Sequence, residues 1–138
     1  IRFINYGDYG MDLYSNCLIV SRKLAKDKPE VVKALVAGFN KGLHDTMADL
    51  DKAIESVAKR EPLINKAVEK ERLIATMEDE MNHPEIAKIG LGDVDDARFK
   101  RSIDLVVKAN SLPRTPEMSE IFSRDFLPPM EERVKKLV

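Results

Sequence analysis

The sequence predicts a helix-rich α/β chain, in which two short N-terminal strands are followed by about five helices. Two β-branched apolar runs, "IRFI" and "CLIVS", flank a loop that contains Gly7 and Gly10, a pattern typical of strand, loop and strand. The remainder of the chain carries apolar residues at spacings of three and four. Two short strands cannot form a stable sheet alone, so we expect them to pair with strands that this chain does not supply.

The first long helix is expected to begin at Pro29, because proline is favoured at the first helical position, with Asp27 as a candidate cap. Its apolar stripe extends over about five turns and consists of Val32, Leu35, Val36, Phe39, Leu43 and Met47. Gly38 and Gly42 lie beside this stripe, and we expect them to let another element pack closely.

Further helices are expected wherever the same spacing returns between prolines and glycines. In order, these segments are residues 50–60, residues 65–81, a helix that follows a loop at 82–94, a short turn from 115 and a last helix from about 130. Asn65 is the expected cap of the helix at 65–81, and Asp93 or Asp95 is the expected cap of the helix that follows the loop.

Composition restricts the class of protein but does not identify a function. The 138 residues suit one domain, and 43% apolar with 34% charged residues are typical of a soluble globular protein. The net charge of −1 gives no reason to expect nucleic acid or an anionic membrane as partner. The single cysteine, Cys17, excludes an internal disulfide and is expected to be a small buried apolar residue.

A metal site was considered at the two acidic clusters of the chain. Their candidate ligands are Asp79, Glu80, His83, Asp93, Asp95 and Asp96. A zinc site needs three or four ligands that converge on one point, whereas these aspartates are placed as helix caps. We therefore predict no metal and no cofactor.

Neither the other histidine nor the basic cluster indicates catalysis. His44 has no nucleophile or acid that the sequence associates with it. The basic run from Arg22 to Lys28 is followed at once by acidic residues, so a solvated face is favoured over a phosphate site. The chain is predicted not to be an enzyme.

All three tyrosines of the chain lie in residues 6–14, next to glycines and carboxylates. Tyrosine combines a flat apolar face with a hydroxyl, and glycine lets the backbone approach a ligand. The candidate ligand-binding residues are Tyr6, Asp8, Tyr9, Tyr14 and Asn16, with Asp12 and Ser15 as further polar groups. An alternative stays open, in which the tyrosines only cover a strand edge.

Four stretches in order resemble the NMT1/THI5-like family of solute-binding proteins, which includes thiamine-pyrimidine synthases and receptors for nitrate, sulfonates and taurine. These stretches are "KDKPEVVKALVA", "TMAD", "GLGDVDDARFKRSIDLV" and "IFSRDFLP". The likeness extends over essentially the whole sequence. It implies a type II periplasmic-binding-protein fold, with two α/β lobes that hold a ligand between them.

By this resemblance, residues 1–138 are one segment, the C-terminal portion of a longer two-lobed protein. Residues 1–21 are expected to form the hinge and cleft strands, and residues 22–138 the helical part of the first lobe. The implied function is the solute-binding component of an ABC importer, periplasmic or anchored outside the membrane as a lipoprotein. Its partners are then a transporter permease and a small polar ligand, such as an aminopyrimidine or a taurine-like sulfonate.

Two alternatives belong to other classes of function. A synthase of this family would use an active-site histidine, a pyridoxal phosphate lysine and a cysteine-rich iron site, and this chain has one cysteine and no histidine near the tyrosines. A helical protein-interaction module would be a compact monomer. A separated lobe is instead expected to expose apolar faces and to dimerise or exchange elements with another copy.

Overall fold

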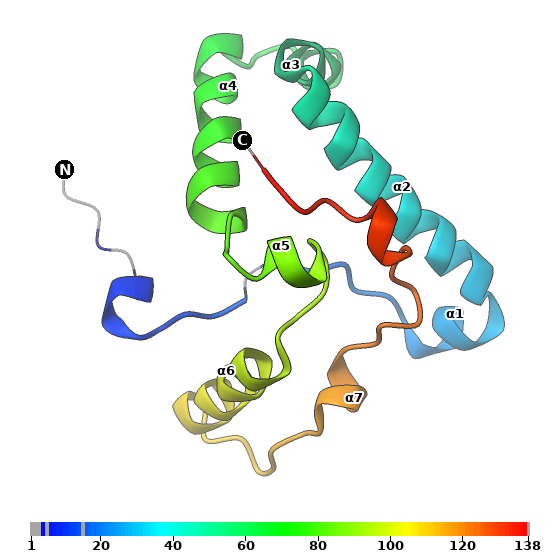
Figure 1. Ribbon diagram of the computed structural model, residues 1–138, viewed down its shortest axis with the longest axis vertical. Coiled ribbons are helices and arrows are strands. Elements are labelled where there is room, and N and C mark those ends of the chain that lie inside the picture. Colours follow the sequence, from blue (N-terminus) through cyan, green and yellow to red (C-terminus); the bar gives the residue numbers. More distant parts are fainter. Residues whose placement is uncertain (1–3, 5, 15, 138) are drawn as a thin grey trace. The chain divides into compact units, whose positions relative to one another are not determined.

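The computed structural model describes residue 4, residues 6–14 and residues 16–137, and within these ranges it contains helices and no strand (Figure 1). The prediction of a helix-rich chain is confirmed. The strand predicted at Cys17–Ser21 is wrong: Ser21 is extended (φ −68°, ψ 145°), but no ladder is formed in the described part of the chain. A strand needs a partner for its backbone hydrogen bonds. The other predicted strand falls largely on residues 1–3, outside the described residues.

The chain divides into two compact units, one made of Ile1–Leu18 with Val94–Asp125 and the other of Ile19–Asp93 with Phe126–Val138. The helical elements of the second unit are α1 (Arg22–Asp27), α2 (Pro29–Ala48), α3 (Leu50–Ala58), α4 (Lys66–Ala75), its π-helical continuation η2 (Thr76–Met81), α5 (Ile86–Ile89) and the 3-10 turn η3 (Met130–Glu132). Those of the first unit are the 3-10 turn η1 (Tyr6–Tyr9), α6 (Asp96–Ala109) and α7 (Met118–Ile121).

Several predicted helix starts are confirmed by their caps. Pro29 begins α2, and the side chain of Asn65 accepts bonds from the first turn of α4 at 3.1 and 3.3 Å. Asp95, rather than Asp93, caps α6 by accepting a bond from the Arg98 amide at 2.8 Å.

The predicted cap at Asp27 is wrong, because an extra short helix precedes α2. Asp27 is the last residue of α1, where its carboxylate pairs with Lys23 on the previous turn. The helix α1 is capped by Ser21, whose hydroxyl accepts a bond from the Leu24 amide at 3.1 Å. A second short helix, α5, lies within the segment predicted as a loop.

The core of the second unit forms where the C-terminal segment packs against its helices. Its buried residues are Met77, Ile86, Val134 and Leu137. The Leu91 amide donates to the Val134 carbonyl at 2.8 Å, which joins the two segments. The last helix predicted from about residue 130 is therefore wrong beyond η3, because Val134 and Leu137 are buried in a segment that is not helical.

Two expectations about packing are also wrong. A methyl group added at Gly38 or Gly42 would meet no atom within 4 Å, so no other described element packs closely against either glycine. Cys17 is exposed rather than buried.

Among the described helices, none is both long and apolar enough to span a bilayer.

Candidate functional site

The predicted site lies in residues 6–16, called here the tyrosine segment. Its first part is η1, where the Gly10 amide donates to the Gly7 carbonyl and the Met11 amide to the Tyr6 carbonyl, both at 3.1 Å. Gly10 has a φ of +82°, which a glycine adopts at no steric cost. These bonds make a tight turn from a stretch that the sequence predicted as a loop.

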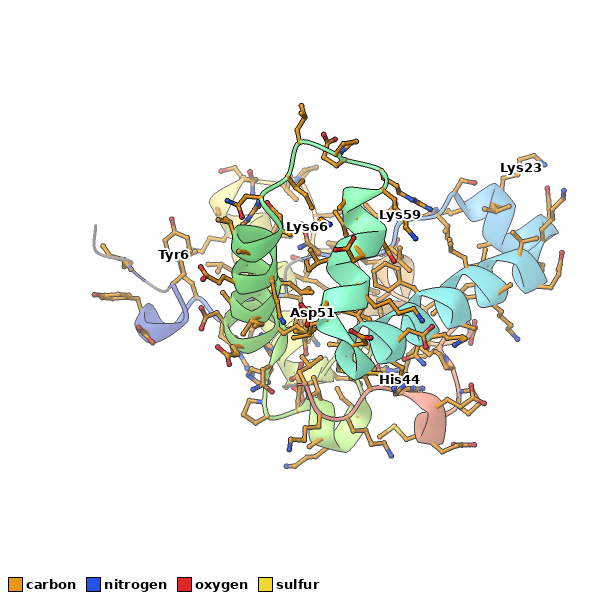
Figure 2. The ribbon with its side chains drawn as sticks, turned by 90° about the horizontal axis from the view of Figure 1, so that it is seen from above. Tyr6, Lys23, His44, Asp51, Lys59 and Lys66 are labelled. Atoms are coloured by element: carbon orange, nitrogen blue, oxygen red, sulfur yellow. The ribbon has the colours of Figure 1, made fainter. Side chains whose placement is uncertain are left out.

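The turn presents two aromatic rings and a carboxylate to solvent. Tyr6 and Tyr9 are 70% and 73% exposed, and Asp8 between them is exposed as well. Figure 2 labels Tyr6 on η1. Exposed phenol rings beside a carboxylate are suited to stacking on a planar ligand and to accepting bonds from its amino groups.

The following residues are held by α6, mainly through Arg98. Its guanidinium Nη2 lies 2.6 Å from Oδ1 of Asp12, and longer bonds of 3.4 Å reach the carbonyls of Asp12 and Leu13. The Arg98 side chain is 10% exposed and that of Asp12 49%. The carboxylate of Asp12, predicted as a ligand acceptor, is thus paired within the protein.

Tyr14 is held by the same helix. Its ring centroid lies 4.2 Å from the guanidinium carbon of Arg98, and its hydroxyl accepts a bond from the Asp95 amide at 2.7 Å. The ring meets Phe99 edge-on at 5.8 Å, and Phe99 meets Phe122 in the same manner at 5.8 Å. Tyr14 therefore has a packing role in this unit, while Tyr6 and Tyr9 do not share that environment.

The predicted residues thus separate into two groups. Tyr6, Asp8 and Tyr9 are exposed on η1, whereas Tyr14 lies against α6. Asn16 is exposed, and Ser15 falls outside the described residues.

Sequence reasoning did not identify Arg98 as part of the site. A signal was present in the sequence: Arg98 and Ser102 stand four residues apart, each directly before an apolar residue of the α6 stripe. In the structure both residues are buried.

Four of the six candidate metal ligands, namely Asp95 with its α6 cap and the three side chains that follow, have structural contacts. Nδ1 of His83 accepts a bond from the Glu85 amide at 3.3 Å, Asp93 pairs with Arg133 at 2.9 Å, and Asp96 pairs with Arg124 at 2.5 Å. Within residues 4, 6–14 and 16–137, no three His, Cys, Asp or Glu side chains gather as a metal-binding group.

His44 has a structural contact of its own. Its Nε2 lies 2.9 Å from the Glu132 carbonyl, to which Asn40 also donates at 2.7 Å. These contacts tie α2 to η3.

A separate open groove of about 810 Å³ lies among α2, α3 and α4. Its polar lining is engaged in the fold: Asp49 caps α3, and Arg72 pairs with Glu69 at 2.8 Å. Ion pairs of 2.6 Å (Lys66–Glu55) and 2.7 Å (Lys70–Asp51) join α3 and α4, which lie side by side in Figure 2. The groove is therefore a weaker candidate for a ligand than the exposed groups of η1.

Comparison with protein families matches one model, described as NMT1/THI5 like, to residues 1–53. The matched range contains the tyrosine segment, α1 and α2, and it ends within α3. The resemblance identified from the sequence is thus confirmed over this part of the chain, while the stretches after residue 53 lie outside the match. A search of curated proteins found no match, and a search of solved structures found none either.

Proposed function

Residues 1–53 of this chain are NMT1/THI5-like, and on this premise we propose that the protein is a solute-binding component of an ABC importer. The observation that carries the proposal is the exposed group of Tyr6, Asp8 and Tyr9 on η1, within the matched range. A solute-binding protein needs such groups at the place where a ligand enters.

The chemistry of η1 favours a planar ligand that is neutral or cationic. Two phenol rings offer faces for stacking, and the carboxylate of Asp8 accepts hydrogen bonds from an amine. The other nearby carboxylate, Asp12, pairs with Arg98. An aminopyrimidine satisfies these groups better than nitrate, which requires basic side chains or backbone amides. A taurine-like zwitterion would place its amine at Asp8.

The remaining parts of the proposal follow from the family. In members of this family the ligand lies between two lobes, and we propose that this chain is part of a longer protein of that kind. That protein is periplasmic, or anchored outside the membrane, and delivers its ligand to a permease. We propose binding rather than synthase chemistry, because the groups exposed on η1 are stacking and hydrogen-bonding groups.

The test is a thermal-shift panel on the longer protein, with aminopyrimidines, taurine, alkyl sulfonates and nitrate. A ligand present at 100 times its Kd stabilises the folded state by about 2.7 kcal/mol, which gives a clear rise in Tm. The rise is expected for an aminopyrimidine and should be lost in Tyr9→Ala and in Asp8→Ala. Asp104→Ala on α6, which is also exposed, is the matched control. If the Tm does not rise with any member of the panel, the proposal is contradicted.

A second candidate, a helical protein-interaction module, is favoured by one exposed apolar face of α2, on which a partner would pack. Val31, Leu35 and Phe39 recur every four residues and are 47%, 50% and 56% exposed. Gly38 lies on the same face, with no atom near the position of a Cβ. An apolar helix face of this kind is typical of a surface that packs against another element or a second copy. The mass of the protein in solution separates the two candidates: a compact monomer favours the interaction module, whereas a dimer or larger species favours a separated lobe of a receptor.

A further inference from the structure

We propose that Arg98 is a positioning residue for the tyrosine segment, which fixes on α6 the residues that follow η1. Arg98 is separated from its partner Asp12 by 86 positions in the sequence. It nevertheless contacts the carboxylate and carbonyl of Asp12, the carbonyl of Leu13 and the ring of Tyr14. Arg98, Asp12 and Tyr14 belong to the same compact unit of the chain.

The contacts of Arg98 require the geometry of a guanidinium group. Nε and Nη2 donate in different directions, to backbone and to carboxylate, while the flat face of the group stacks on Tyr14. Lysine offers one ammonium group that cannot do both. The Arg98 side chain is only 10% exposed, whereas that of Asp12 is 49% exposed, so these contacts are shielded from water on the side of the arginine.

A second set of contacts joins Tyr14 to the start of α6 beside Arg98. The Asp95 amide donates to the Tyr14 hydroxyl, and Phe99 packs against the Tyr14 ring. The carboxylate of Asp95 also caps α6. The start of α6 and residues 12–14 are thus held by shared contacts, whereas the hydrogen bonds within η1 only close the turn.

The consequence for ligand binding rests on the function proposed above. If Tyr6, Asp8 and Tyr9 contact a ligand, their position depends on an arginine that does not touch it. Loss of Arg98 should then weaken binding without removing any group that contacts the ligand.

The test uses the fact that this chain contains no tryptophan and has its three tyrosines in one segment. In a Tyr6→Phe/Tyr9→Phe background, Tyr14 is the single tyrosine emitter, and quenching of its emission by acrylamide reports exposure of that ring. Arg98→Met keeps the length of the side chain but removes its donors, Arg98→Lys keeps the charge, and Arg101→Met on exposed α6 surface is the matched control.

Arg98→Met should increase quenching of Tyr14 and speed hydrogen exchange of the Asp95 amide by about tenfold, as expected for loss of a charge-assisted contact. Arg98→Lys should restore these readouts only in part, and Arg101→Met should leave them unchanged. If Arg98→Met loses helical circular dichroism, Asp12→Asn replaces it, because it weakens the same contact from the tyrosine segment. Unchanged quenching and exchange in a helical Arg98→Met or Asp12→Asn variant would overturn the proposal.

The ligand consequence is measured separately on the longer protein, with 4-amino-5-hydroxymethyl-2-methylpyrimidine as the probe. Its Kd should rise about tenfold in Arg98→Met and stay constant in Arg101→Met. If the probe and the rest of the panel do not bind the unsubstituted protein, the proposed function fails. The quenching and exchange measurements then still decide the role of Arg98.

Discussion

Arg133 lies in a nearly buried cluster of the unit that contains α2 to α5, and its replacement by methionine is expected to destabilise that unit. Nη1 of Arg133 lies 2.9 Å from Oδ2 of Asp93 and donates to the Ile89 carbonyl at 2.9 Å. Its Nε donates to the Pro128 carbonyl at 2.8 Å. The two charged side chains are 14% and 11% exposed.

The magnitude follows from this burial. Removal of one partner of a buried ion pair costs about 3–5 kcal/mol, because the other charge stays in the interior without its counter-ion. Since a tenth or so of each side chain reaches water, the lower end applies, about 3 kcal/mol. For a chain of this length the Tm should fall by roughly 10 °C. Methionine retains most of the apolar packing, so the loss measures polar contacts rather than a cavity.

Urea unfolding followed by circular dichroism measures this free energy. Lys135→Met, at an exposed position two residues further on, should change the stability by less than about 0.5 kcal/mol. The double variant Arg133→Met/Asp93→Asn should lose about 2 kcal/mol less unfolding free energy than the sum of the losses in the two single variants, because each single substitution already removes the same ion pair. An Arg133→Met variant as stable as Lys135→Met would refute the reasoning.

Three further predictions concern backbone, cap and surface. Gly90→Ala should cost about 3 kcal/mol in urea unfolding, because φ is +74° and the new Cβ would lie 2.5 Å from Cβ of Arg133; a loss below that of a typical surface substitution contradicts this. Asn65→Ala should cost about 1 kcal/mol by loss of the α4 cap, and Asn65→Asp should cost little; equal losses would exclude capping as the cause. Phe39→Ser should reduce dimers or larger species in light scattering, while Val68→Ser, at an exposed apolar position of α4, should not; an unchanged mass contradicts the proposed apolar contact.

Helix positions were predictable wherever a local signal was sufficient. Proline at the first position of α2 and the polar caps Asn65 and Asp95 act within one turn, so their effect can be read from neighbouring residues. The extra helix α1 was missed, although Ser21 carries the same type of signal. The basic residues that follow Ser21 indicate a charged surface and do not by themselves indicate a helix.

Packing was not predictable where it depended on residues distant in the sequence. Residues 130–138 have good helix formers, yet Val134 and Leu137 become buried in a segment that is not helical, since burial outweighs helix propensity. Cys17 lies in an apolar run and is nevertheless exposed in the described structure.

The same distinction applies to the candidate site. Composition along the chain shows, without a structure, that aromatic residues, carboxylates and glycines are concentrated in residues 6–16. Which of these residues are exposed depends on the folded chain: Arg98, 86 positions away in the sequence, pairs with Asp12 and packs on Tyr14, while Tyr6, Asp8 and Tyr9 lie on the surface. The physical reason is that burial and charge pairing depend on which distant segments meet, and spacing along the chain does not specify that.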